Sequence, residues 1–179
     1  HEKHLAHPWE SCMTLGNGWG WITNEKYKSA TKIIHTLTEI VAKGGNLLLG
    51  IGPKADGTLS DTVVQRLQEI GQWMTVNGKA IYETRTTTHY RDGNIFFTKA
   101  KRGDTHYAIA CLPEGQPLPT TIEWKENIPV KGSKMTLLQT GKTVKYTVTG
   151  NTVKVQLPAT LLKPGASYPA LVFSFSKSP

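Results

Sequence analysis

The sequence has few cysteines and no long apolar run. Only Cys12 and Cys111 occur among its 179 residues, which excludes a small scaffold held together by many disulfides. They lie in segments with different residue patterning, so we expect two free, buried thiols and no disulfide between them. No stretch approaches the roughly 20 apolar residues that a membrane-spanning helix requires, so the sequence predicts no membrane span.

Several signatures of catalytic and ligand-binding sites are also missing. The chain has no Gly-x-Ser-x-Gly turn that would present a serine nucleophile. No Gly-Lys-Ser/Thr follows the glycines of segment 50–53, so a phosphate-binding loop is not predicted there. His1, His4 and His7 are spaced three residues apart on an expected loop, which does not match a metal-ligand pattern. We therefore expect no metal and no cofactor.

The chain is basic, with a formal net charge of +8. Its lysines are scattered at one or two per strand-like segment, whereas nucleic-acid-binding proteins gather them into a patch with exposed aromatics. Lysines on the solvent side of strands also protect sheet edges against pairing with another chain. Nucleic acid is therefore not expected as a partner.

Helical periodicity dominates the first half of the chain. Ser29 and Ser60 are expected helix N-caps, with Asp61 in the first turn of the second helix, and Gly44-Gly45 and Asn77-Gly78 are expected to end the two helices. Each helix carries an apolar stripe at helical spacing. The stripe residues are Ile33, Ile34, Leu37 and Val41 in the first helix, and Val63, Leu67, Ile70 and Met74 in the second.

Between these helices lies a short apolar run, residues 46–51, which glycines bound on both sides. Such a run is typical of a parallel strand that is buried on both faces, and residues 12–15 are a second candidate strand. Two strands and two helices cannot bury both faces of a parallel sheet. We therefore expect an upstream partner that supplies the rest of a sheet or barrel, and the chain opens on His1-Glu2 without an initiator methionine.

After residue 84, apolar and polar residues alternate with the two-residue period of a β-strand. Turn signals such as Asp92-Gly93 and Thr140-Gly141 separate the strand-like segments, and no helical pattern is present there. Seven short strands at this spacing predict an antiparallel β-sandwich. The segments are 94–98, 106–111, 120–124, 135–138, 145–148, 152–157 and 170–175.

A set of motifs within residues 8–84 resembles the C-terminal part of the glycoside hydrolase family 29 α-L-fucosidases. The matching segments are 8–14 (PWESCMT), 18–21 (GWGW), 43–53 (KGGNLLLGIGP), 56–58 (DGT), 71–73 (GQW) and 76–82 (VNGKAIY). Two departures stand out: the family usually carries Asn at the position of Gly50, and Tyr is commoner than Trp at position 21. The resemblance implies an α/β plus all-β fold. Residues 1–84 would hold the last βα units of a catalytic (β/α)8 barrel, and residues 85–179 would form a C-terminal β-sandwich domain.

The same resemblance implies a retaining exo-α-L-fucosidase that removes terminal α-L-fucose from fucosylated glycans or glycosides. Retention needs two carboxyl groups about 5–5.5 Å apart, a nucleophile and an acid/base. The family's nucleophile is an Asp upstream of residue 1, so this chain alone is expected to be inactive. At most one of Glu2 and Glu10 would be the acid/base, and an upstream residue is the third alternative. Glu10 would otherwise be a buried supporting carboxylate, and Glu2 a solvated terminal residue.

Trp19 matches a family aromatic that lines the pocket near the fucose C5 methyl group, and the alternative is a core-packing indole. Trp9 and Trp21 are expected to be structural, and Trp73 to be buried against the sandwich. The family needs no metal or cofactor. The sequence leaves the localisation unknown, and the resemblance is compatible with a secreted, periplasmic or lysosomal protein. A different class of function is a non-catalytic β-sandwich module that stabilises the barrel or binds carbohydrate. Aromatics spread at one or two per strand favour stabilisation over sugar binding.

Overall fold

The computed structural model describes residues 7–177. In that range β1 (Trp9–Thr14), α1 (Ala30–Ala42), β2 (Gly45–Gly50) and α2 (Asp61–Asn77) come first, followed by a short 3-10 turn (Gly78–Ala80). Only strands follow: β3 (Thr84–Asp92), β4 (Ile95–Ala100), β5 (Thr105–Cys111), β6 (Thr121–Lys125), β7 (Met135–Leu137), β8 (Lys142–Val144), β9 (Tyr146–Thr149), β10 (Thr152–Gln156) and β11 (Ala170–Ser176).

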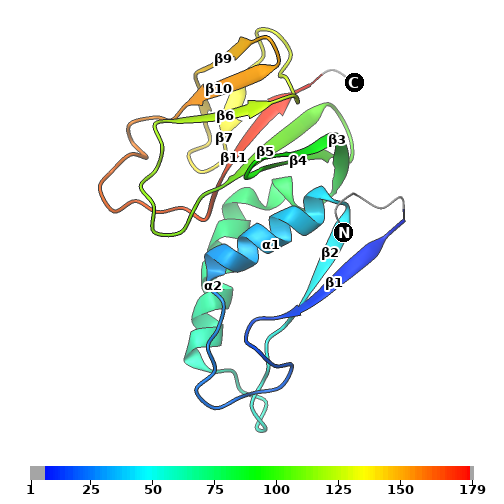
Figure 1. The fold of residues 1–179 in the computed structure, drawn as a ribbon, viewed down its shortest axis with the longest axis vertical. Coiled ribbons are helices and arrows are strands. Elements are labelled where there is room, and N and C mark those ends of the chain that lie inside the picture. The colour runs from blue at the N-terminus through cyan, green and yellow to red at the C-terminus, as the bar shows by residue number, and fades with distance from the viewer. Residues whose placement is uncertain (1–6, 178–179) are drawn as a thin grey trace.

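These elements form four layers (Figure 1). A parallel β1–β2 pair lies on one side of the two helices, and a six-stranded sheet, ordered β3-β4-β5-β11-β7-β8, lies on the other. A three-stranded sheet, ordered β6-β10-β9, covers the outer face of the six-stranded sheet. All pairings within the two larger sheets are antiparallel, so the second half of the chain is the predicted β-sandwich.

Helix α1 begins and ends as predicted. The Ser29 hydroxyl accepts a hydrogen bond from the Lys32 backbone N–H at 3.1 Å, and the helix ends before Gly44, whose φ is +84°. The apolar stripe divides between two cores. Ile33 packs toward β1–β2, while Ile34 packs toward the six-stranded sheet. A single helix therefore contributes to the packing on both of its sides.

Helix α2 divides its contacts along its length. Val63, in its first turn, is buried toward β1–β2. Trp73, near its end, is buried against the six-stranded sheet, and its indole N–H donates to the Ala170 carbonyl at 3.1 Å. The expected burial of Trp73 against the sandwich is confirmed. Among residues 7–177, neither helix is both long enough and apolar enough to cross a membrane.

The core of the sandwich is built around one tryptophan. Trp124, on β6, is 1% exposed and lies with its ring centroid 6.0–6.1 Å from those of Phe97, Phe173 and Phe175. The three phenylalanines belong to β4 and β11 of the facing sheet. The period-two patterning thus places Trp124 and these three phenylalanines of the facing sheet in one common core.

The seven predicted strands are present, but two further strands were not predicted. The sequence of β3 is largely polar, and of its nine residues only Thr87 is buried. β8 has three residues, of which Val144 alone is buried. Both strands lie at the edges of the six-stranded sheet. Edge strands bury too little side-chain surface to show a clear alternating pattern.

The two cysteines are free, as predicted, but only one is buried. Burial raises the pKa of the Cys111 thiol to about 12, so this side chain behaves as a small apolar group. Cys12 is exposed because it lies on the face of β1 that the helices do not cover. The expectation of two buried thiols is therefore wrong for Cys12.

Candidate active site

The two-stranded sheet has one covered face and one open face. Met13, Leu47 and Leu49 pack against the helices. Glu10, Cys12, Asn46 and Leu48 alternate with them along the strands and are all exposed. Within residues 7–177 only the helices cover the sheet, so one face of segment 46–51 is open. This agrees with the expectation that two strands and two helices cannot bury both faces of a parallel sheet by themselves.

Trp19 lies at the carboxyl edge of this sheet, in the loop that joins β1 to α1. The indole ring rests on the end of β2: a Cβ placed on Gly50 would be 2.8 Å from Cε3 and 2.9 Å from Cζ3 of Trp19. The side chain is nevertheless 60% exposed. One part of the ring is therefore supported by the strand, while another part is exposed among the described residues.

A second close contact, between Gly52 and the backbone of Gly20, holds the same loop against the chain that follows β2. Gly52 has a φ of +58°, and a Cβ on it would lie 2.9 Å from the Gly20 carbonyl oxygen. Glycine is required at position 52 for both reasons. The loop segment next to Trp19 thus crosses directly over the end of β2.

Two charged side chains hold the ends of the Trp19 loop. The Lys28 ammonium donates to the carbonyl oxygens of Thr14 at 2.7 Å and Gly16 at 2.8 Å. The Glu25 carboxylate accepts from Asn17 Nδ2 at 2.7 Å and lies against Gly16, where a Cβ would be 2.7 Å from its Cδ. These contacts join the start of the loop to its end.

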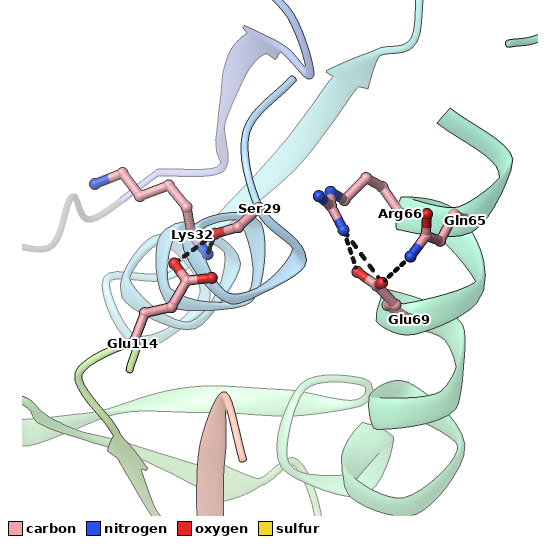
Figure 2. A network of polar contacts seen from close by, with 6 residues as sticks. All are labelled: Ser29, Lys32, Gln65, Arg66, Glu69 and Glu114. Carbon is pink, nitrogen blue, oxygen red and sulfur yellow. Dashed lines mark hydrogen bonds and ion pairs between the residues drawn. The ribbon is translucent and has the colours of Figure 1, made fainter. Parts of the chain in front are cut away.

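The sandwich contacts the residue that follows Lys28. Figure 2 shows Glu114, from the loop after β5, accepting a hydrogen bond from the Ser29 hydroxyl at 2.9 Å. Ser29 is also the N-cap of α1, where a negative charge is favoured by the helix dipole. The loop bearing Trp19 is thus connected through α1 to the sandwich.

We predict that Lys28→Met destabilises this chain by about 1.5–3 kcal/mol, the usual range for hydrogen bonds to a charged group. The reason is that two partly buried carbonyls lose their shared donor. Urea unfolding followed by circular dichroism measures the change, and Lys26→Met, at an exposed lysine of the same loop, is the matched control. Equal midpoints for the two variants would contradict the role of Lys28.

The structure does not bring Glu10 and Trp19 together. Glu10 lies in the β1–β2 ladder opposite Asn46, near the amino end of its strand, and accepts from the Cys12 thiol at 3.6 Å. Thr14, at the carboxyl edge, is four positions further along the chain, about 13 Å along an extended strand. Its side chain is exposed, so the buried supporting carboxylate is not seen among the described residues. Glu2 lies outside the described residues.

The remaining tryptophans of this region differ in their surroundings. The Trp9 ring lies against Gly45, where a Cβ would be 2.5 Å away, and its N–H donates to the Lys43 carbonyl at 3.3 Å. This agrees with a structural role in the turn between α1 and β2. Trp21 is 45% exposed, so the burial that a structural role would give it is not observed.

Some features of the site carried no recognisable sequence signal. Lys28 donates hydrogen bonds to backbone carbonyls, and Glu25 accepts one from a side-chain amide. Contacts of this kind do not require a recognisable sequence motif. The packing of Trp19 on Gly50 joins residues 31 positions apart, and only the β1–β2 register brings them together. In residues 7–177, no group of three or more His, Cys, Asp or Glu side chains is placed to hold a metal ion.

Comparison with known proteins identifies relatives of one kind. Residues 1–79 match the family model described as Alpha-L-fucosidase. The human plasma alpha-L-fucosidase is 38% identical over 112 residues, which are 59% of this chain and 24% of that protein. The Branchiostoma floridae alpha-L-fucosidase is 33% identical over 161 residues, 85% of this chain and 34% of that protein. The chain thus spans about a quarter to a third of these relatives.

Solved structures agree with the sequence comparison. The Thermotoga maritima alpha-fucosidase in complex with fucose superposes with a TM-score of 0.79 at 29% identity, covering 98% of this chain and 41% of that one. A family 29 alpha-L-fucosidase from Bacteroides thetaiotaomicron gives a TM-score of 0.74 at 28% identity, covering 94% and 38%. Both the parallel-strand part and the sandwich are included in this coverage. The family model, the relatives and the solved structures agree that this chain is similar to a C-terminal portion of alpha-L-fucosidases.

Proposed function

We propose that this chain is part of a retaining exo-α-L-fucosidase that hydrolyses terminal α-L-fucose from glycans or glycosides, and that it forms one wall of the active site. The observation that carries the proposal is the position of Trp19, largely exposed at the carboxyl edge of β1–β2 and supported from behind by Gly50. Enzymes with parallel β/α architecture place their chemistry at this edge. An indole face suits the apolar C5 methyl group of a 6-deoxy sugar.

Residues 1–84 would contribute the last βα units of a (β/α)8 barrel, and residues 85–179 the sandwich domain. The open face of β1–β2 supports this arrangement. It exposes Leu48 to 43% beside Cys12, and further barrel strands would cover that apolar surface. The upstream part of the protein is therefore the first partner of this chain.

The nucleophilic aspartate belongs to that upstream part, and this chain alone is inactive. Of the two candidate acid/bases, Glu2 fits better than Glu10. Glu10 is held in the ladder about 13 Å from the carboxyl edge. Glu2 precedes Trp9 by seven positions, and an extended chain of seven steps reaches about 23 Å. That span exceeds the length of β1, so the sequence position of Glu2 is compatible with a role at the edge where Trp19 lies.

The sandwich has a supporting role in this proposal. Its six-stranded sheet buries one side of α1 and the end of α2, and Trp73 is hydrogen-bonded to Ala170. Its large aromatics are mostly buried in the core; Trp124, Phe97 and Phe173 are at most 1% exposed. Stabilisation of the barrel therefore fits this domain better than independent carbohydrate binding.

Hydrolysis of an aryl α-L-fucoside tests the proposal. The complete protein should release the phenol, and α-L-fucose should be the anomer that proton NMR detects first, because a retaining mechanism preserves the configuration. The isolated 179-residue chain should release none. A complete protein that binds fucose but never hydrolyses the glycoside would exclude the enzymatic role.

A further inference from the structure

A row of basic side chains crosses the first three strands of the six-stranded sheet. Arg85 on β3 is directly opposite Lys99 on β4, and Lys99 is directly opposite His106 on β5. Residues directly opposite one another share a face of the sheet. His106 is opposite Phe175 of β11 and stacks on its ring, with the centroids 6.2 Å apart. Since Phe175 belongs to the sandwich core, the row lies on the outer face of the sheet, and Arg85 and Lys99 are its exposed end.

Lys177 adds a further cation to this row. It follows Phe175 by two positions, so its side chain returns to the same face. Its ammonium group donates a hydrogen bond to Asn127 Oδ1 at 3.3 Å, which holds it in place. Burial lowers the pKa of His106, and the positive charges of Lys177 and Lys99 lower it further. Both ammonium groups are therefore close to the imidazole, which is neutral at pH 7.

Like charges directly opposite one another destabilise a sheet. The three-stranded sheet of the same chain carries the favourable arrangement: Lys154 on β10 is opposite Glu123 on β6, and the two form an ion pair at 2.7 Å. In the six-stranded sheet Arg85 is opposite Lys99, and among residues 7–177 neither forms an ion pair with a carboxylate. The repulsion between them is therefore left uncompensated.

The acidic side chains nearby do not neutralise the row. Glu83, two positions before Arg85, is paired with Lys101 at 3.4 Å. The carboxylate of Asp104 acts on His106 less strongly than the two lysines do. A net positive charge thus remains on this part of the sandwich.

We propose that the cationic patch formed by Arg85, Lys99 and Lys177 binds an acidic glycan, one whose sugars carry sulfate or carboxylate groups. The inference rests on the proposed function, in which glycans are the substrates of the complete protein. An anion placed between these cations would remove their repulsion, and guanidinium and ammonium groups form charge-assisted hydrogen bonds with such anions. Neighbouring strands lie about 4.8 Å apart, so adjacent cations can reach one anionic group together.

The patch is separate from the candidate active site. The helices lie between the six-stranded sheet and the β1–β2 pair, and the patch is on the sheet face that points away from the helices (Figure 1). It would therefore anchor a long acidic glycan at a distance from the fucose that is cleaved.

Nucleic acid is a poorer fit to the patch. Its binding sites combine cations with exposed aromatic side chains on which bases stack. The exposed tryptophan and tyrosine side chains of residues 7–177 are Trp19, Trp21 and Tyr82, and none of them lies on β3, β4 or β5. Binding would depend on the charges of the glycan and not on stacking against its sugar rings.

Binding of a sulfated fucan to the complete protein tests the inference, with the chemically desulfated fucan and double-stranded DNA as comparison ligands. At low ionic strength the sulfated fucan should bind and the desulfated fucan should not, and added salt should weaken binding because exposed charges are screened. Arg85→Gln/Lys99→Gln should weaken binding about 3–10-fold, because each exposed charge contact contributes a small factor.

Lys125→Gln/Lys154→Gln is the matched control. It removes the same net charge from exposed lysines of the three-stranded sheet and should change the affinity by less than about twofold. Equal losses in the two double variants would overturn the inference, because binding would then follow the overall charge of the protein. It would also be overturned if the sulfated fucan did not bind, or if DNA bound more tightly.

Lys99→Glu separates a binding role from a structural one. It places a carboxylate opposite Arg85, as Glu123 is placed opposite Lys154, so Tm should not fall. Binding of the sulfated fucan should nevertheless fall further than in Lys99→Gln, and unchanged binding would contradict the proposal. Since binding is measured without hydrolysis, an active fucosidase that ignores the sulfated fucan refutes this inference alone. A protein that binds the fucan but cleaves no fucoside refutes the proposed function instead.

Discussion

Glu2→Gln lowers kcat of the complete enzyme about 10²–10⁴-fold on a fucosyl disaccharide, which is the usual contribution of a general acid. The reason is that a sugar leaving group has to be protonated as the glycosidic bond breaks. An aryl fucoside whose phenol is acidic needs little protonation, so its first step should be affected much less. The pH profile should also lose the limb that reports the protonated acid.

Glu10→Gln is the matched control for this experiment, since it makes the same change at the other candidate. Glu10 is fixed in the β1–β2 ladder opposite Asn46, so its replacement should leave the difference between the two substrates unchanged. Should Glu10→Gln instead show the leaving-group dependence, the assignment of Glu2 is wrong and Glu10 is the acid/base. If neither variant shows it, the acid/base lies upstream of this chain.

Trp124→Ala is expected to destabilise the chain by about 3–5 kcal/mol, the range for removing a fully buried aromatic side chain. The indole fills the centre of the sandwich, with Phe97, Phe173 and Phe175 around it. No neighbouring side chain can fill the space that it leaves, because all three partners are held in strands of the facing sheet. The loss includes both apolar burial and aromatic contacts.

Thermal unfolding by calorimetry measures this effect. For a domain of this size, 1 kcal/mol corresponds to about 2–4 °C in Tm, so Trp124→Ala should lower Tm by roughly 6–20 °C. Val148→Ala, at a valine of β9 that is 41% exposed, is the control and should change Tm by only a degree or two. Similar losses for the two variants would mean that Trp124 is not the centre of the core.

Local patterns in the sequence were sufficient to predict most of the elements. Ser29 and Ser60 cap the two helices as predicted, because an N-cap hydroxyl acts on backbone groups only three residues away. The segments in which apolar and polar residues alternate are strands, and the apolar side of each strand faces a core. β3 and β8 escaped prediction because edge strands are stabilised mainly by backbone pairing, which residue identity does not encode.

Long-range contacts decided the candidate site. The motif residues predicted a pocket wall near Trp19. The sequence contains no local sign that the Trp19 ring would pack on Gly50, or that Lys28 would donate hydrogen bonds to backbone carbonyls at the start of the loop. Glu10 and Trp19 are nine residues apart in sequence, yet the extended strand directs them to different parts of the sheet. Sequence proximity is a poor guide to proximity at a site when a strand lies between the residues.

By itself, the sequence determined the helices and their caps, seven of the sandwich strands and the resemblance to alpha-L-fucosidases, since each of these depends on residue types at short spacing. Only the tertiary structure decided which side of α1 serves which core, that one face of β1–β2 is open, and that Trp19 stands supported at the carboxyl edge of that sheet. The physical reason is that packing between elements depends on register and on the space left by neighbours. Neither quantity can be read from the chain one segment at a time.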